Sequence, residues 1–253
     1  MQMLRAYPIS EIFGPVRQGE GPDAGLSVNF VRVAGCDYDC LLCDTKYAVN
    51  PSYPGWAKTD MTAEEIAIAL GNLGGFAKTI VFSGGNPGLF VDYPLLDSLA
   101  VKGWKCVMET QGTKINEAVL RSASLNRLVI SPKPPSMGMA DRSEKDQESV
   151  RKMFRTRKDL YLPVTLKFVA FDIDDLAWIR RYIQFMHMKF EDNELFLSVG
   201  SPIEPLTSLE GTRTIILKRY ELLIRDTADD SILSQCKIIP QLHTLIYGQK
   251  RGV

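Results

Sequence analysis

Short runs of apolar and β-branched residues recur along the chain, and each predicts a strand. The runs are mostly continuous rather than alternating, which is typical of strands buried on both faces of a parallel sheet. We interpret seven segments in this way: residues 28–34, 79–82, 105–108, 128–130, 164–170, 195–199 and 237–239.

The segments between these runs carry helical patterns. The clearest begins at Thr62, where Glu65 three residues later completes a capping box, and continues as an apolar stripe through Ile66, Ala69 and Leu70. Weaker helical patterns cover residues 93–101, 116–122, 174–187 and 209–224. Because strands and helices alternate along nearly the whole chain, we predict an α/β fold with parallel strands. A modified, partial TIM-type (β/α) barrel in a single domain over residues 1–253 is the expected architecture.

Unusual polar groups follow nearly every predicted strand at its carboxyl end. In barrels and open α/β sheets this edge carries the active site, so we expect these segments to converge on one mouth. The segments are residues 36–43, 83–87, 109–112, 131–133, 198–201 and 241–243.

The composition and net charge of the chain indicate which class of molecule it binds. The 253 residues include 30 Lys plus Arg and 30 Asp plus Glu, so no net field favours a nucleic acid. A small-molecule substrate is the better expectation. The N-terminal segment has no apolar h-region, and no stretch approaches the roughly 18 apolar residues of a membrane span. We therefore expect a cytoplasmic protein without a membrane segment.

Three of the five cysteines, Cys36, Cys40 and Cys43, form a Cys-x3-Cys-x2-Cys array. An odd count with this crowding is a poor disulfide framework and a reasonable metal site in a reducing compartment. Three thiolates can hold three corners of a 4Fe-4S cluster and leave one iron open to bind a small molecule. Cys106 and Cys236 lie in or beside apolar strands and are expected to pack as small hydrophobes.

Two other kinds of site remain open at this point. Zinc needs four protein ligands, for which the chain adds only two isolated cysteines and the histidines His187 and His243. An iron-sulfur or zinc module that grips RNA or a protein is a further alternative, although the neutral charge and the polar strand ends do not favour it.

The cysteine array and the Gly-Gly motif that follows it resemble the radical S-adenosylmethionine superfamily. More narrowly, the chain from Glu11 to its end resembles the 7-carboxy-7-deazaguanine synthase family. The resemblance rests on QGEG at 18–21, FVRVAGC at 30–36, CDT at 43–45, SGGNP at 83–87, ETQGT at 109–113 and SPKPPSMGM at 131–139. Another small enzyme of the superfamily, such as an activase, would explain the cysteines but not QGEG together with QLH at 241–243.

This resemblance implies a homodimer with a modified, partial barrel that converts 6-carboxy-5,6,7,8-tetrahydropterin into 7-carboxy-7-deazaguanine with loss of ammonia, a step toward queuosine. It implies a 4Fe-4S cluster, S-adenosylmethionine, assistance by Mg²⁺, and an external flavodoxin-like or ferredoxin-like one-electron donor. The reduced cluster would cleave S-adenosylmethionine, and the 5′-deoxyadenosyl radical would abstract hydrogen from C6 of the pterin.

Residue by residue, the resemblance places the cluster on Cys36, Cys40 and Cys43 within a loop of residues 35–47. S-adenosylmethionine would contact the segments after three strands. We expect its contacts at Gly84, Gly85, Asn86, Glu109, Gln111, Ser131 and Lys133. For Glu109, pairing with a loop amide is the alternative interpretation.

The resemblance also implies which residues would bind the pterin and the magnesium ion. Thr45 would be the magnesium ligand, an oxygen donor suited to a hard cation, unless it is an ordinary loop or N-cap threonine. Pterin contacts are expected at Gln18, Glu20, Arg32, Gln241 and His243, the last two within a substrate-binding segment of about residues 236–253. Arg suits a carboxylate, although Arg32 could instead be a surface cation at a strand edge.

The chain departs from the family pattern at two places. Asn86 stands where the superfamily commonly has Glu, which removes a charge near the cofactor's ammonium but keeps a carbonyl acceptor. The sequence after His243 is longer than in some family members, so a role for the terminal carboxylate of Val253 does not carry over.

Overall fold

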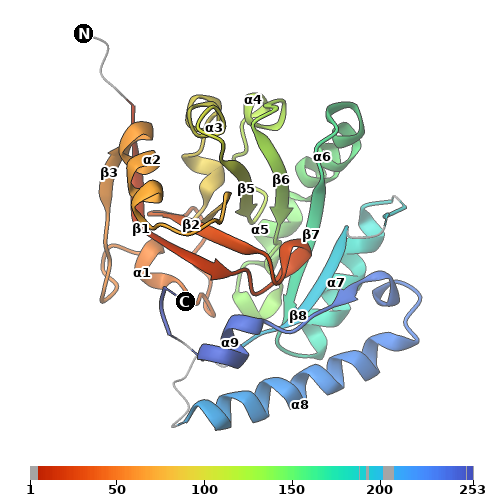
Figure 1. The fold of residues 1–253 in the computed structure, drawn as a ribbon. Coiled ribbons are helices and arrows are strands. Elements are labelled where there is room, and N and C mark those ends of the chain that lie inside the picture. The colour runs from red at the N-terminus through yellow and green to blue at the C-terminus, as the bar shows by residue number, and fades with distance from the viewer. Residues whose placement is uncertain (1–4, 188, 192–193, 202–207, 249, 253) are drawn as a thin grey trace.

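The computed structural model describes residues 5–187, 189–191, 194–201, 208–248 and 250–252. Its centre is a nine-stranded sheet in the order β3-β1-β2-β4-β5-β6-β7-β8-β9 (Figure 1). All neighbouring pairs from β2 to β9 are parallel, whereas β1 pairs antiparallel with both β2 and β3. The order does not return to its start, so the sheet is an open, partial barrel, as predicted.

The strands are β1 Ala6–Arg17, β2 Ser27–Val33, β3 Thr59–Thr62, β4 Thr79–Gly84, β5 Lys105–Thr110, β6 Leu125–Ile130, β7 Val164–Ala170, β8 Leu195–Val199 and β9 Lys237–Ile238. The helices are α1 Lys46–Val49, α2 Ala63–Asn72, α3 Tyr93–Ala100, α4 Glu117–Leu120, α5 Ala140–Lys145, α6 Gln147–Leu160, α7 Ile173–Phe185, α8 Leu209–Ala228 and α9 Leu242–Tyr247. Short 3-10 turns occupy Gly21–Asp23, Pro87–Leu89, Pro135–Met137 and Leu233–Gln235. Within the described residues, no helix is long and apolar enough to cross a membrane.

All seven predicted strands are present, and the capping box between Thr62 and Glu65 begins α2 as expected. The sequence pattern missed β1 and β3, which lie at the antiparallel edge of the sheet. It also missed α6, because half of that helix is charged and few of its apolar residues, such as Val150 and Phe154, are buried. A thin apolar stripe of this kind gives a weak helical signal.

The two faces of the sheet have different surroundings. The outward-facing side chains of β4 and β5, Ile80, Phe82, Cys106 and Met108, join the main core together with α2, α3, α6 and α7. The inward-facing residues form a separate small cluster of valines, Val28, Val81, Val107 and Val129. Successive side chains of a strand point to opposite faces, so the residues two and four positions after each valine share this inner face.

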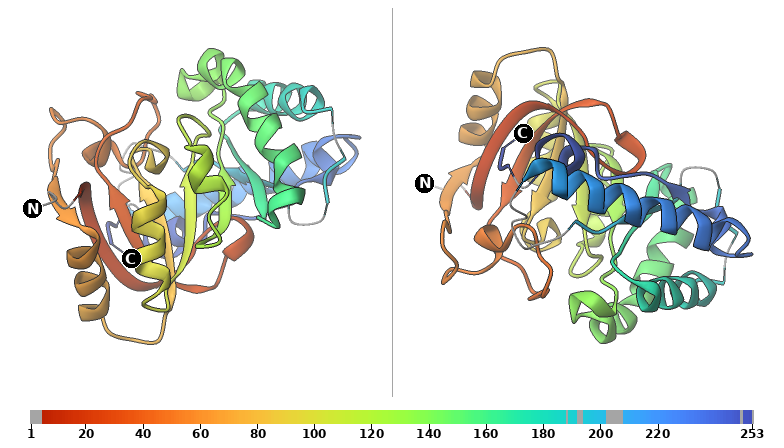
Figure 2. Two further views of the ribbon diagram at one scale, coloured as in Figure 1. Left: turned by 90° about the horizontal axis from the view of Figure 1, so that it is seen from above. Right: turned by 90° about the horizontal axis from the view of Figure 1, so that it is seen from below.

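The carboxyl ends of the parallel strands point toward the C-terminal part of the chain. In Figure 1 the arrowheads of β5 and β6 point downward, toward the side where α8, α9 and the C-terminus lie. Seen from below in Figure 2, α8 crosses this end of the molecule. The inner face is therefore filled by the valine cluster and approached by α9 at the carboxyl end of the strands.

A buried carboxylate fixes the loop after β6 to the start of α7. Asp175 is fully buried and accepts hydrogen bonds from Ser136 N at 3.0 Å, Ser136 Oγ at 2.6 Å and Phe171 N at 2.8 Å. The neighbouring Met137 carbonyl accepts from Leu41 N at 3.0 Å. One carboxylate thus holds the turn on which the cysteine loop rests.

We expect Asp175→Ala to destabilise the fold by about 3 kcal/mol, because a buried charged acceptor of several hydrogen bonds is lost and its donors are stranded. Equilibrium urea unfolding followed by circular dichroism measures this. Asp174→Ala, one residue away and exposed, is the matched control and should change the free energy of unfolding by about 0.5 kcal/mol or less. Equal effects of the two variants would contradict the role assigned to Asp175.

Candidate active site

The inner face opens into a cavity of about 280 Å³ at the carboxyl edge of the sheet. This lies near the lower end of the size of small-molecule sites. Fifteen of the predicted site residues line it: Gln18, Glu20, Arg32, Cys36, Cys40, Cys43, Thr45, Gly84, Gly85, Glu109, Gln111, Ser131, Lys133, Gln241 and His243. Asn86 is the predicted residue that does not. The polar strand ends therefore do converge on one mouth.

The three cysteines lie on the loop that follows β2, and several contacts hold this loop in place. Tyr38 OH donates to Asp146 at 3.1 Å, and the Arg142 guanidinium donates to the Asp37 carbonyl at 2.7 Å. The Arg142 guanidinium also lies 5.0 Å from the centre of the Tyr38 ring. The loop is thus fastened to α5 and to the start of α6.

The thiols of Cys36, Cys40 and Cys43 are free and only partly buried. Burial raises the pKa of all three, that of Cys40 to about 11, and the positive charge of Lys133 acts against this rise at each of them. Among the described residues, no three His, Cys, Asp or Glu side chains are gathered closely enough for a single metal ion. Three thiols on one loop that face a cavity beside a cation suit a multi-iron cluster, whose corners are separate atoms, better than one zinc ion.

The glycine pair after β4 lies directly against the beginning of the cysteine loop. Gly85 N donates to the Val33 carbonyl at 3.0 Å, and Asn86 N donates to the Gly35 carbonyl at 2.9 Å. A Cβ atom on Gly85 would overlap the Gly35 carbonyl, and Gly84 has φ +112°. Only glycine permits this approach, which brings an exposed stretch of backbone beside Cys36.

Asn86 lies behind the cavity wall and is fully buried. Its Oδ1 accepts from Thr110 Oγ1 at 2.7 Å and from Gly88 N at 3.0 Å. Its Nδ2 donates to Asp37 Oδ1 at 2.9 Å and to Thr113 Oγ1 at 2.8 Å. The side chain is therefore occupied in fixing the loop after β4. The expected contact with the amino group of S-adenosylmethionine stays a prediction for this residue.

Gln111 faces the cavity from the end of β5, and its orientation is set by the same Asp37. Gln111 Nε2 donates to Asp37 Oδ1 at 2.7 Å and to Thr113 Oγ1 at 3.1 Å, and lies 3.8 Å from Cys36 Sγ. Because the amide nitrogen is used in these contacts, its carbonyl oxygen remains as the acceptor. An acceptor beside the first cysteine suits a ligand that carries an ammonium group.

Ser131 and Lys133 follow β6 and lie across the cavity mouth from the glycine pair. Lys133 Nζ donates to Ser131 Oγ at 3.1 Å, and the Lys133 backbone N–H donates to Ser143 Oγ at 2.8 Å. The ammonium therefore has a fixed place near the three thiols. It supplies positive charge and hydrogen-bond donors to a carboxylate or hydroxyl ligand.

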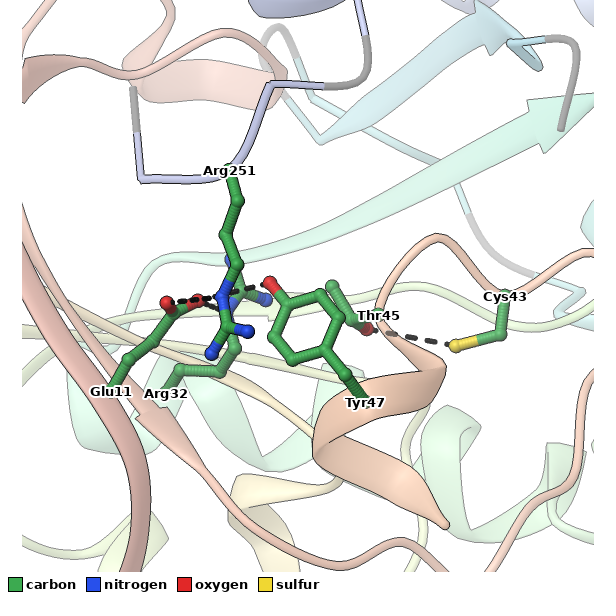
Figure 3. Close-up of polar contacts among 6 residues, drawn as sticks. All are labelled: Glu11, Arg32, Cys43, Thr45, Tyr47 and Arg251. Carbon is green, nitrogen blue, oxygen red and sulfur yellow. Dashed lines mark hydrogen bonds and ion pairs between the residues drawn. The ribbon is translucent and has the colours of Figure 1, made fainter. Parts of the chain in front are cut away.

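Three side chains converge on the carboxylate of Glu11 in β1 (Figure 3). Arg32 Nε lies 2.7 Å from Oε1, Tyr47 OH donates to the same atom at 2.9 Å, and Arg251 Nε lies 2.8 Å from Oε2. The Arg251 guanidinium also stacks on the Tyr47 ring at 3.8 Å. Arg32 is therefore an anchored cation rather than a loose surface charge. In the described part of the chain its Nη atoms take no part in a hydrogen bond or ion pair.

Thr45 lies on the same side of the cavity, at the beginning of α1. Its side chain caps no backbone group, and its Oγ1 lies 3.6 Å from Cys43 Sγ, the contact drawn in Figure 3. The hydroxyl thus stands between the cysteine loop and the cluster of charges around Glu11. A simple N-cap role does not account for it.

A second charged group occupies the far wall of the cavity. Gln18 Nε2 donates to Glu109 Oε1 at 2.9 Å, while Gln18 Oε1 accepts from Gly19 N at 2.8 Å. Lys167 Nζ lies 3.2 Å from Glu20 Oε2 and 3.6 Å from Glu109 Oε2. Glu109 therefore pairs with the side-chain amide of Gln18, in the loop after β1, and with Lys167. Its expected contact with S-adenosylmethionine stays a prediction.

The C-terminal segment closes this wall. Leu242 N donates to the Gly19 carbonyl at 2.9 Å, and Ser201 Oγ donates to Gln241 Oε1 at 2.9 Å. A Cβ atom on Gly19 would overlap the ring of His243, so the QGEG turn and the QLH segment fit together only with glycine at this position. Residues 18–21 and 241–243 thus form one surface.

Sequence reasoning did not single out several residues that shape the cavity: Glu11, Asp37, Tyr47, Lys167 and Arg251. Lys167 carried a readable signal, since a lysine inside the buried strand run VTLKFVA requires a partner. Glu11 is opposite Arg32 in the β1–β2 register, but this pairing follows only once β1 is assigned. For the other three, no local pattern distinguishes them from surface residues.

Comparisons with known proteins agree with this geometry. A sequence model of the radical SAM superfamily matches residues 30–169. The 7-carboxy-7-deazaguanine synthase of Bacillus subtilis (strain 168) is 35% identical over 256 residues, which cover 99% of this chain and 100% of that protein. The protein of the same name from Bacillus cereus is also 35% identical, over 99% of this chain and 100% of its own length.

The fold is also similar to a solved structure. The crystal structure of QueE from Escherichia coli matches with a TM-score of 0.60, over 94% of this chain and 95% of that chain, at 20% sequence identity. This likeness concerns the fold, and it agrees with the open, mostly parallel sheet.

The Glu11 cluster predicts a pH-dependent contribution to stability. Burial alone would raise the pKa of Glu11, but hydrogen bonds from Arg251, Tyr47 and Arg32 and the charge of Arg32 lower it below 4.5. Because the folded pKa is depressed, the stabilisation is present above the unfolded value and is lost as the pH falls through the folded value. We expect Glu11→Gln to cost about 1 to 3 kcal/mol at pH 7 and less at pH 3.5.

Urea unfolding of the wild type and the Glu11→Gln variant at both pH values measures this difference. Glu64→Gln is the matched control, because the exposed Glu64 pairs only with Lys102 at the surface. A deficit of Glu11→Gln that is equal at pH 7 and pH 3.5 would show that the lost contacts are not those of an ionised carboxylate.

Proposed function

The chain belongs to the radical SAM superfamily and, within it, to the 7-carboxy-7-deazaguanine synthase family, and we propose that it converts 6-carboxy-5,6,7,8-tetrahydropterin into 7-carboxy-7-deazaguanine with release of ammonia. One observation carries the proposal: a single cavity is lined by the three-cysteine loop, the glycine pair and the charged wall formed by QGEG and QLH. Cluster, cofactor and substrate determinants thus face one another.

Cys36, Cys40 and Cys43 would hold a 4Fe-4S cluster at three corners, within a loop of residues 35–47. When bound, such a cluster with S-adenosylmethionine on its open iron supplies a carbon radical able to remove hydrogen from the substrate. The protein's part is to exclude water and to orient both ligands. Weak contacts of Tyr38 N, 3.4 Å from Cys36 Sγ, and of the Gln111 amide help to orient the first thiolate.

The cofactor's methionine part would lie along the backbone of Gly84 and Gly85. Gln111 offers a carbonyl acceptor to the ammonium, and Lys133 with Ser131 offers donors to the carboxylate or ribose. Asn86 acts on this site through Asp37 and Thr110, which support Gln111 and the loop after β4. The negative charge that Glu would bring at position 86 is present here on Asp37.

The substrate would be held between the two charged groups. The Nη atoms of Arg32 offer donors to the 6-carboxylate, with Mg²⁺ on Thr45 as a second cation at that end. Gln18, Glu20, Gln241 and His243, together with Glu109, offer polar groups to the ring. In this arrangement the carboxylate and the ring edge of the pterin are recognised on opposite walls.

We extend the proposal to the organisation of the chain. A single catalytic domain over residues 1–253 would take its substrate-binding segment from about residues 236–253. The contacts of Gln241, His243 and Arg251 support this segment. Val253, whose carboxylate was considered for substrate binding, lies outside the described residues.

The proposal also covers the protein's binding partners and its cellular location. Apolar side chains exposed on α8, among them Leu217 and Ile224, support a homodimer, which sedimentation velocity tests. A flavodoxin-like or ferredoxin-like protein would supply the electron. The need for three reduced thiols supports a cytoplasmic setting.

The decisive assay incubates the reconstituted, reduced protein anaerobically with S-adenosylmethionine, Mg²⁺ and 6-carboxytetrahydropterin and follows 7-carboxy-7-deazaguanine by mass. We expect product from the wild type and none from Cys40→Ala, which removes a cluster thiolate. Cys106→Ala is the matched control, since Cys106 packs in the core on the outer face, and its product should remain.

Other outcomes separate the alternatives. Cleavage of S-adenosylmethionine with unchanged pterin would keep the superfamily and reject the substrate, as for an activase. A full cluster whose reduced spectrum does not respond to S-adenosylmethionine would indicate a closed, structural centre and would reject the enzyme hypothesis.

The magnesium site has its own test. Thr45→Val removes the hydroxyl and keeps the shape of the side chain, so we expect its rate at moderate Mg²⁺ to fall by about tenfold or more, as for lost metal-site groups. Thr45→Ser should retain most of the response to Mg²⁺. Magnesium titrations of the steady-state rate measure both. A Thr45→Val enzyme that responds to Mg²⁺ as the wild type does would exclude this ligand.

A further inference from the structure

Lys167 lies in the middle of β7 and is the cation of the far wall of the cavity. Its side chain is 6% exposed, and the strand around it, VTLKFVA, is otherwise almost entirely buried and apolar. The side chain of Lys167 points into the cavity because alternate residues of a strand share a face. Val169 and Phe171, two and four positions later, also line the cavity. A lysine buried here has a substantial desolvation cost that its partners must offset.

Its partners are two carboxylates that come from separate parts of the chain. Glu20 lies between β1 and β2, Glu109 lies in β5, and Lys167 Nζ reaches both, at 3.2 Å and 3.6 Å. The remaining oxygen of Glu109 accepts from Gln18. Three charges therefore share one wall and sum to a single negative charge.

The directions in which the pKa values of these groups are shifted agree with this geometry. Burial would lower the pKa of Lys167, yet the charges of Glu109 and Glu20 raise it well above its ordinary value. Burial would raise the pKa of Glu20, yet the charges of Lys167 and His243 lower it. Asp44, a further charge that acts on Lys167, lies in the cysteine loop. Both sets of shifts favour charged Lys167 and ionised Glu20.

We propose that Lys167 is a positioning residue that holds Glu20 and Glu109 as a pair of ionised acceptors for the 2-amino-4-oxopyrimidine edge of the substrate. Ionised carboxylates only accept hydrogen bonds, and beside its 4-oxo acceptor this edge presents three donors, one ring N–H and two amino N–H groups. Two carboxylates held side by side can serve all three donors. The inference deepens the proposed function and rests on it.

The role follows from what two buried carboxylates do without a cation between them. Like charges in a shared desolvated site cannot both stay ionised, so one takes up a proton and its pKa rises. A protonated carboxyl group then turns an O–H toward the donor edge of the ring. Binding would become weak at neutral pH and would recover as the pH rises and the second carboxyl ionises.

The test measures binding rather than turnover. 6-Carboxypterin, an oxidised and fluorescent analogue with the same pyrimidine edge, is titrated into the cluster-loaded protein with S-adenosylmethionine present, between pH 6.5 and pH 9. We expect Lys167→Met to raise the Kd about tenfold or more at pH 7, in line with the loss of one partner of a buried charge group. This deficit should shrink toward pH 9, and Lys167→Arg should restore part of the affinity.

Two controls isolate the effect. Lys105→Met removes an exposed lysine at the amino end of β5, far from the cavity mouth, and should bind as the wild type does. Iron content and circular dichroism show whether each variant folds and loads. The Kd of each variant is compared with that of the wild type at the same pH, so that ionisation of the analogue's own ring N–H within this range affects both proteins alike.

The outcomes are distinguishable. A folded Lys167→Met that binds 6-carboxypterin as the wild type does overturns the inference and leaves the proposed function intact. A deficit of equal size at every pH also overturns it, because it would indicate lost contact or packing rather than a change in the carboxylates. A wild type that does not bind the analogue rejects the pterin substrate, and the inference falls with it.

Discussion

The structure depends on the alternation of side chains along a set of parallel strands. One valine on each of β2, β4, β5 and β6, such as Val81 in β4 or Val107 in β5, marks which residues face inward. Two and four positions later the same face carries Glu109 and Gln111, and on β6 it carries Ser131. Because the period of a strand is two, a slip of one residue would turn every one of these groups into the outer core. The same alternation of side chains therefore determines both how the core packs and which residues form the site.

The charged side chains at the cavity are organised as two separate groups. One joins Glu11 to the guanidinium groups of Arg32 and Arg251, and the other joins Lys167 to Glu20 and Glu109. Each carboxylate pairs with a cation, and the two groups carry net charges of opposite sign, positive around Glu11 and negative around Lys167. What differs is the group left facing the ligand, guanidinium nitrogens on one wall and carboxylate oxygens on the other. A ligand with a carboxylate at one end and N–H donors at the other fits that polarity.

The sequence alone was sufficient to predict features whose residues lie close together in the chain or form a continuous apolar run. The cysteine array, the glycine pair and the seven buried strands could be predicted because each signal lies within a few residues. It was insufficient where a role depends on distant partners. The contact of Arg251 with Glu11 joins residues 240 positions apart. Asn86 belongs to a motif that predicts cofactor binding, yet its side chain lies behind the cavity wall and is hydrogen-bonded to Asp37. Lys167 was missed because a strand pattern records its apolar neighbours and gives no weight to the one cation among them.

The contacts of Glu11 connect the end of the chain to the recognition of a carboxylate. Glu11 takes Arg32 through Nε, which leaves the two Nη atoms to a ligand and fixes the plane of the guanidinium. The second oxygen of the same carboxylate holds Arg251, whose guanidinium in turn lies on the ring of Tyr47. A displacement of the C-terminal segment would therefore free one oxygen of Glu11 and uncover Tyr47. Arg32 would then be free to turn its Nη atoms onto Glu11 in a bidentate pair, at the expense of the ligand. In the proposed function, the C-terminal segment would thus support carboxylate recognition by occupying the oxygen that would otherwise compete for Arg32.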